Sequence, residues 1–224
     1  MSEYMTKLTS NKDTLRVKAY KEIKAKIICL QLKPGEKIFA TEIAKGLKIS
    51  RTPVREALLI LENEKLVECD GKIGFIVKKL NTKEVEEYFA IRKAFEAFAA
   101  PLIVERITTS EIEAVKKNIT EAQSYLKKND FYNIVQSESK FHEILWRSTK
   151  SEVFFQIISG LSDKFQWIRA IALSAQGGSR ESIDDHKKIV SLVERKDSDK
   201  LKRFSVLHIE HARKKYALTQ GLFM

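Results

Sequence analysis

The segment at residues 50–67, SRTPVREALLILENEKLV, limits the possible folds of the N-terminal part more than any other. Thr52 followed by Pro53 predicts a helix start, because a threonine hydroxyl can cap backbone amides and proline suits the first helical position. Arg51 and Arg55 stand one helical turn apart at its front. Behind them, five apolar residues at helical spacing predict one buried face. These are Val54, Leu58, Leu59, Leu61 and Leu66.

A helix that is buried behind and carries two arginines in front has the layout of a recognition helix in the DNA major groove. There, arginine can bind guanine through two hydrogen bonds. The flanking sequence agrees. Helical periodicity over 14–32 ends at a Pro-Gly pair, and a second helix is expected from Thr41 to about Gly46. Residues 66–77 predict a β-hairpin with an Asp-Gly turn. The expected unit is a helix-turn-helix with a β wing.

The charge of the chain is consistent with an acidic partner. The formal net charge is +11, and residues 1–79 carry 17 of the 41 basic side chains but only 10 of the 30 acidic ones. Such a balance favours nucleic acid as a partner, although a generally lysine-rich surface would also produce it. Cys29 and Cys69 have no zinc-like spacing. With no apolar leader and no apolar run long enough to cross a bilayer, a cytoplasmic protein is expected.

The remainder of the chain predicts helices only. Asn81 with Glu84, and Thr108 with Glu111, resemble capping boxes that start two helices. Helical periodicity continues to about residue 218, with 151–175 predicted as one helix. The expected fold is mainly α: a winged helix-turn-helix domain at 1–79, then an all-α antiparallel bundle of about six helices at 80–224.

The N-terminal motifs LKPGEKI, EIAKGLKISRTPVREAL and LENEKLVECDGKIGFIV occur in one order over about residues 15–79. In this order they resemble the winged helix of the GntR superfamily of bacterial transcription regulators. The resemblance implies that operator DNA is contacted by the front of the recognition helix, the helix before it and the wing. The implied residues are Thr41, Ser50, Arg51, Thr52, Arg55, Gly71 and Lys72. An ion pair of Arg55 with Glu56 or with an acidic residue of the wing, and a simple solvated role for Lys72, are the alternatives.

All four histidines fall in the predicted bundle. Glu138 and His142 are four residues apart, so both side chains leave one face of a helix. His186 lies on a later helix, and either His208 or His211 could join it from the last. Three imidazoles and a carboxylate suit Zn, Ni, Mn or Fe, and leave positions open for a small ligand.

The segments SESKFHEIL, DDHKKIVSLVERKD and FSVLHIEHARKKY resemble the effector-binding FCD domain of the FadR-type branch of the same superfamily. The resemblance implies metal ligands at Glu138, His142, His186 and His208, with His211 on the surface. Glu138 stands where the family usually has aspartate, which leaves metal choice and geometry open.

The segment YFAIRKAFE resembles the opening of the same domain. Effectors of this branch are often small carboxylates, and the resemblance makes Arg92 the candidate that pairs with one. The alternative is a structural pair of Arg92 with Glu96, four residues away.

Together these patterns predict a homodimeric transcription regulator, a repressor rather than an enzyme, that binds operator DNA. Its operator affinity would change when a small organic acid binds at a divalent metal, with Zn first and Ni or Mn next. Two alternatives use the same histidines: a regulator for which the metal ion itself is the signal, and a metal-dependent hydrolase or lyase. A non-specific nucleic-acid binder is the third.

Overall fold

The computed structural model describes residues 2–71 and 74–219, with side chains from Thr14 onward. The contacts within it separate the chain between Leu80 and Asn81 into two compact units. None of the helices in the described ranges is long and apolar enough to cross a membrane.

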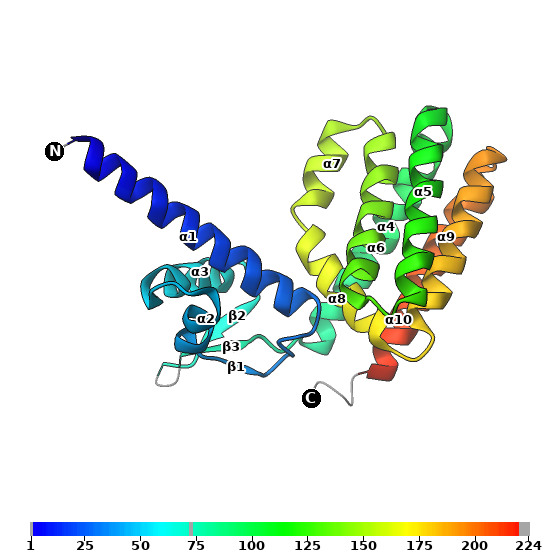
Figure 1. The fold of residues 1–224 in the computed structure, drawn as a ribbon. Helices are drawn as coiled ribbons and strands as arrows, with labels where there is room; N and C mark the ends of the chain where they lie inside the picture. The colour runs from blue at the N-terminus through cyan, green and yellow to red at the C-terminus, as the bar shows by residue number, and fades with distance from the viewer. Residues whose placement is uncertain (1, 72–73, 220–224) are drawn as a thin grey trace. The chain divides into compact units, whose positions relative to one another are not determined.

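In its described residues, the first unit combines three helices with a small sheet (Figure 1). Its elements are α1 (Ser2–Ile28), β1 (Lys37–Ile38), α2 (Ala40–Leu47), α3 (Arg51–Asn63), β2 (Val67–Cys69) and β3 (Phe75–Val77). The sheet is antiparallel with the order β1-β3-β2, and Val77 pairs with Val67. The predicted hairpin is therefore present, and the extended segment before α2 adds a third strand to it. At the turn, Asp70 N–H donates to the Gly74 carbonyl at 2.9 Å, and Gly71 takes a positive φ of 55°.

Helix α3 differs in two details from the expectation. It begins at Arg51 after an extended Ser50, so Thr52 is not its cap and Pro53 is the third helical residue. A proline is tolerated there because the first-turn amides have no partner inside the helix. Leu59 is 51% exposed although it was expected in the core. It follows Leu58 directly, and consecutive helical residues point about 100° apart.

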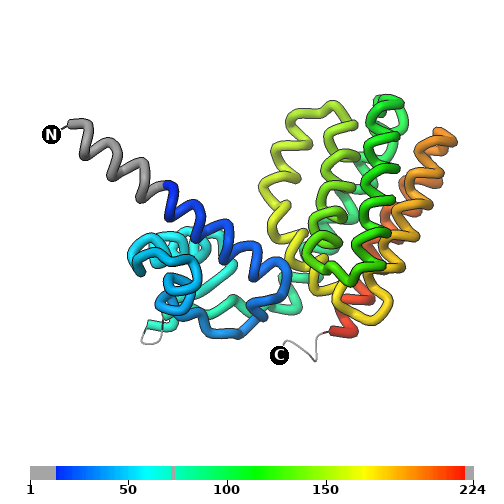
Figure 2. Tube along the Cα trace, viewed as in Figure 1, coloured from blue at the N-terminus to red at the C-terminus, as the bar shows by residue number. Residues whose placement is uncertain are grey.

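The second unit contains seven helices within the described residues. They are α4 (Thr82–Arg106), α5 (Thr109–Lys127), α6 (Phe131–Ser148), α7 (Glu152–Ser159), α8 (Ser162–Ser174), α9 (Gly178–Glu194) and α10 (Ser198–Thr219). The α-carbon trace shows α5 and α6 lying side by side (Figure 2). The mainly α class, with a winged helix followed by a helical bundle, is confirmed.

The extra helix arises inside the segment expected to form one helix over 151–175. The break falls at Gly160 and Leu161, where Ser162 Oγ donates to the Ser159 carbonyl at 2.8 Å. A serine that bonds a nearby carbonyl competes with the helical ladder, and glycine weakens it further. By contrast, the capping box at Thr108 is present as expected, with both reciprocal bonds made.

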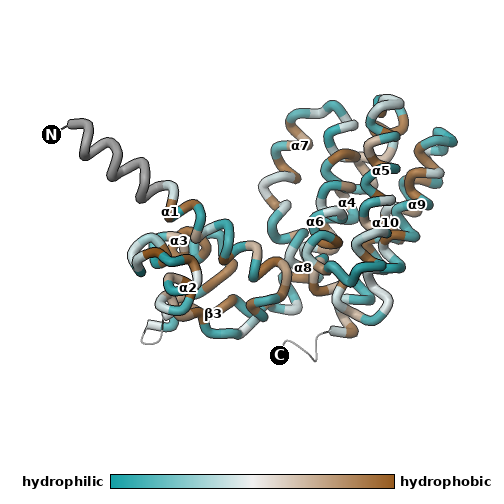
Figure 3. Tube along the Cα trace, in the orientation of Figure 1, coloured by the Kyte–Doolittle hydropathy of each residue, from teal (hydrophilic) through white to brown (hydrophobic). Residues whose placement is uncertain are grey.

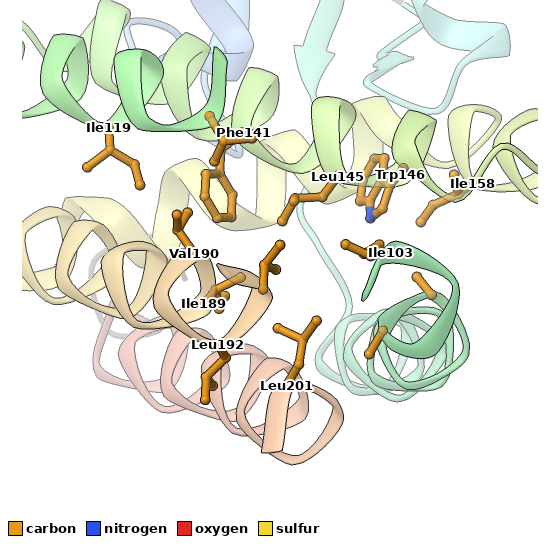
Figure 4. Close-up of a cluster of buried hydrophobic side chains, with 14 of the residues drawn as sticks. Ile103, Ile119, Phe141, Leu145, Trp146, Ile158, Ile189, Val190, Leu192 and Leu201 are labelled. Carbon is orange, nitrogen blue, oxygen red and sulfur yellow. The ribbon is translucent and has the colours of Figure 1, made fainter. Parts of the chain in front are cut away.

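The interior of the bundle is apolar, and it fixes the directions of the helices. Residues such as Phe141 and Leu145 of α6 point toward Ile189 and Val190 of α9 (Figure 4). Coloured by hydropathy, the trace alternates between apolar and polar segments along these helices (Figure 3). This alternation is typical of amphipathic helices that pack around one core. Helix α10 packs against α4, α8 and α9, so it carries His208 into the interior of the unit.

Candidate metal centre and effector cavity

Three histidines from three helices come together inside the bundle. His142 projects from α6, His186 from α9 and His208 from α10, and one ring nitrogen of each lies within 4.8 Å of the others. All three side chains are buried, with at most 5% exposed. The rings of His142 and His208 have centroids 5.4 Å apart, and those of His186 and His208 are 5.0 Å apart.

The donor set fits a divalent ion. Both ring nitrogens of His142, Nε2 of His186 and Oε1 of Glu138 are buried without a hydrogen-bond partner. Burial, followed by nearby positive groups, holds the pKa of His142 and His186 well below the ordinary value. Both rings are therefore neutral and keep a lone pair, which is the form that binds metals. Unpaired polar atoms of this kind are costly unless something satisfies them.

Glu138 lies next to this group but outside it. Its Oε2 accepts a hydrogen bond from Ser182 Oγ at 2.7 Å and lies 3.5 Å from Nε2 of His186. Burial raises the pKa of the Glu138 carboxyl. The three histidines are thus brought together as predicted, whereas the carboxylate reaches only His186 among them.

Asp185 is a member of the site that sequence reasoning missed. Its Oδ2 is 3.1 Å from Nδ1 of His208 and 2.8 Å from Nδ1 of His211. Burial raises the pKa of Asp185, but the two histidine hydrogen bonds outweigh burial, so the net shift is downward. With Asp185 charged, each Nδ1 is the donor, which leaves Nε2 of His208 as the nitrogen available to a metal. His211 is 39% exposed, yet it belongs to this network and is not a plain surface residue.

A cavity adjoins the histidines. Its lining includes both apolar side chains and the charged groups Arg92, Arg169, Asp185, Glu181 and Lys215. His142 and His208 form part of its wall. A mostly apolar cavity with a few convergent polar groups is the usual form of a small-molecule site.

Arg92, the expected effector residue, is buried and paired within its own helix. Its Nε donates to Glu96 Oε1 at 2.8 Å, and Nη2 lies 2.8 Å from the same oxygen without hydrogen-bond geometry. The guanidinium stacks between the rings of Trp146 and Phe165, at 4.3 and 4.9 Å. Arg92 therefore lines the cavity and is also the structural partner of Glu96.

The residues expected to contact DNA lie on the surface of the first unit. Thr41, Ser50, Arg51, Thr52, Arg55 and Gly71 are all exposed. Within the described part of the chain, neither arginine makes an ion pair, so the alternative pairing of Arg55 with Glu56 is absent. Lys72 lies outside the described residues.

Two family matches cover the two units. Residues 15–77 match the gntR family of bacterial regulatory proteins, and residues 87–211 match the FCD domain. The chain therefore belongs to the transcription regulators that join a GntR-type DNA-binding domain to an FCD domain. The families and the relatives are regulators and not enzymes, which removes the hydrolase or lyase alternative.

Individual relatives agree with this class. The uncharacterized HTH-type transcriptional regulator YdhC of Bacillus subtilis (strain 168) is 26% identical over 193 residues, 86% of each chain. The solved structure of Escherichia coli McbR/YncC superposes with a TM-score of 0.75 at 21% identity, covering 94% of this chain and 99% of that one. A structure described as the metal-free FCD domain of TM0439 matches at a TM-score of 0.56 and 14% identity, over 65% and 99% of the two chains. FCD domains can bind metal, and the three-histidine group is the candidate centre here.

Proposed function

We propose that this protein is a cytoplasmic, homodimeric repressor whose operator affinity changes when a small carboxylate binds beside a divalent metal ion in the second unit. The observation that carries the proposal is the group of three buried histidines, two of which, His142 and His208, line a cavity that also holds charged groups. Buried ring nitrogens without a hydrogen-bond partner destabilise a protein interior. A metal ion bound as part of ligand sensing would give them a partner.

The residues that would hold the ion are His142, His186 and His208, with Glu138 as a fourth donor after a small side-chain shift. Asp185 would hold the ring of His208 in the tautomer that leaves Nε2 free, as carboxylates do behind metal-bound histidines. Zn is the first choice for such N and O donors, with Ni and Mn as alternatives. A bound ion supplies Lewis-acid positions for a carboxylate.

The link to DNA would pass through α4. This helix carries Arg92 at the cavity and follows the wing strand β3 after a connector at residues 78–81. An effector that favours one position of α4 changes operator affinity, and operator binding changes effector affinity by the same factor. At the DNA, Arg51, Arg55 and Thr52 would meet bases and phosphates, with Thr41, Ser50, Gly71 and Lys72 beside them.

The dimer would form through an apolar face of the second unit. On α4, Ile91, Ala94, Phe98 and Pro101 are exposed at heptad-like spacing, and Phe98 is 54% exposed. On α7, Val153 and Ile157 are 68% and 54% exposed. The Phe98 ring lies 5.4 Å from that of Phe154, which joins the two helices into one surface. A second copy is the natural occupant, because two recognition helices on a palindromic operator need two-fold symmetry.

One set of experiments on the full-length protein tests this function. The metal content is measured by elemental analysis, and an operator is selected from random DNA. Operator affinity is then measured by fluorescence anisotropy with the metal removed, with metal restored, and with metal plus succinate, malate or acetate. We expect metal and an acid together to change the affinity.

The double variant His142→Ala with His186→Ala should lose both metal and response, while the exposed Lys188→Ala serves as the control. An unchanged metal content and response in the double variant would contradict the proposal. A response to metal alone would instead identify a metal sensor.

A further inference from the structure

A second arginine, Arg169, lines the cavity beside Arg92. Arg169 projects from α8 and lines the cavity beside His142 and His208. Its Nη1 donates to Ser139 Oγ at 3.0 Å. Among the described residues, no carboxylate oxygen lies within 4.0 Å of its guanidinium.

The two arginines of the cavity are therefore in different states. The charge of Arg92 is met inside the protein by Glu96 at 2.8 Å and by two aromatic faces. Arg169 has only a neutral hydroxyl, and Ser139 itself donates to the Val135 carbonyl at 3.1 Å. Of the five N–H donors of a guanidinium, Arg169 uses one in its hydrogen bond to Ser139 and has others left for a ligand.

The Arg169 guanidinium is half-buried in the cavity wall, so it has lost part of its hydration, and no carboxylate of the described residues replaces that water at ion-pair distance; Glu138 and Glu96 act on it only from farther away. Burial, followed by the nearby charge of Arg92, lowers the pKa of Arg169 to about 9. The usual partner of a buried guanidinium is a carboxylate, because its two oxygens match the fork of N–H donors and accept two hydrogen bonds. A carboxylate entering the cavity would supply that missing anion.

We propose that Arg169, rather than Arg92, anchors the acidic group of the effector, and that Arg92 shapes the cavity through its pair with Glu96. This inference rests on the proposed function. The wall that carries Arg169 also carries His142 and His208. One small molecule that meets both features needs a carboxylate for the guanidinium and a second oxygen group for the metal centre. The ligand class is therefore a small dicarboxylate or hydroxycarboxylate, and a simple monocarboxylate should bind more weakly.

The test is isothermal titration calorimetry on the full-length, metal-loaded protein, with succinate, malate and acetate as probes. The variants are Arg169→Met, which removes the charge, and Arg169→Lys, which keeps the charge but loses the fork. The control is Arg147→Met, because Arg147 lies on the neighbouring groove and pairs with Glu143 at 2.8 Å. Metal content and thermal unfolding are recorded for each protein.

We expect native protein and the Arg147 variant to bind succinate or malate more tightly than acetate. Arg169→Met should weaken the diacid by roughly 10- to 100-fold, as for a lost hydrogen bond to a charged group, with metal content unchanged. The diacid affinity of Arg169→Lys should lie between those of the native protein and Arg169→Met. If the methionine variant does not fold, the lysine variant provides the test. Unchanged diacid affinity in the folded Arg169 variants overturns this inference alone. Failure of the native protein to bind any of the acids overturns the proposed effector function as well.

Discussion

Asp185 and His208 are joined by a hydrogen bond of 3.1 Å from Nδ1 to Oδ2, and both side chains line the cavity. The bond occupies Nδ1 of His208 and leaves Nε2 as the nitrogen available to a metal shared with His142 and His186. Because a carboxylate behind a ligating histidine typically changes metal affinity by 10- to 100-fold, Asp185→Asn should weaken metal binding by about that factor. Competition with a chelator measures it. Asp184→Asn, which removes only an exposed pair with Lys187, should bind metal as the native protein does.

Metal should stabilise the fold measurably. A ligand that binds only the folded state at 100 times its Kd adds about 2.7 kcal/mol to the free energy of unfolding. Differential scanning calorimetry with and without Zn should therefore show a rise in Tm, and His186→Ala should abolish that rise. An equal rise in the variant would mean that the ion binds elsewhere.

Two glycines should respond to alanine with opposite signs. At Gly178 an added Cβ would lie 2.5 Å from the Ala172 carbonyl oxygen, so the α8–α9 junction must open. Gly178→Ala should lower the free energy of unfolding by about 1–3 kcal/mol. Gly46 lies in α2 with no atom within 4 Å of a new Cβ, so Gly46→Ala should raise the stability of its unit by about 0.4–1 kcal/mol. Urea denaturation followed by circular dichroism measures both, and equal effects would contradict the packing described here.

Arg51 and Arg55 should contribute to sequence-specific DNA binding, unlike other basic residues on the surface. Arg51→Ala or Arg55→Ala should weaken binding to a selected operator by about 1–3 kcal/mol if each arginine meets a base. If the arginine instead contacts a phosphate, its removal should weaken binding to operator and random DNA alike and lower the slope of the salt dependence by about 1. Anisotropy titrations on operator and random DNA separate these outcomes, with the exposed Lys18→Ala as the control. Unaltered affinity for both DNAs would remove these arginines from the interface.

The α4–α7 face should hold the dimer together. Phe98→Asp places a charge at the centre of the exposed apolar surface, and the desolvation of that charge should prevent association. Sedimentation analysis should show the variant as a monomer with weaker operator binding. Leu218→Asp, at a side chain that is 73% exposed on α10, should leave assembly intact. A dimeric Phe98 variant would place the interface elsewhere.

Much of the architecture follows from local chemistry that a sequence carries openly. The apolar period of α3, the Asp-Gly turn of the wing and the capping box at Thr108 each act over a few residues. Such signals predict where elements begin and what type they are. These signals failed in two places. At Gly160 one predicted helix is two helices in the structure. At Leu59 the side chain is exposed, because it and the adjacent Leu58 cannot both point to the buried face of the helix.

The histidine group was likewise predicted in part from the sequence and decided in part by tertiary packing. The spacing of Glu138 and His142 places them on one face of a helix, and the family resemblance selects His186 and His208. Spacing alone, however, cannot bring three helices together. That meeting depends on the packing of α6, α9 and α10 around the apolar core.

Charge pairing depends on that packing even more. The pattern YFAIRKAFE marks Arg92 as the arginine of interest. Only the folded bundle shows that Glu96 already neutralises it, while Arg169 has no carboxylate within 4.0 Å in the described part of the chain. Asp185 likewise has no motif of its own, and it acquires a role because α9 and α10 place it between His208 and His211. Periodicity and capping depend on residues that are close together in the sequence, so they can be predicted from it. The partners of a buried charge are supplied by segments distant in sequence, so only the tertiary structure identifies them.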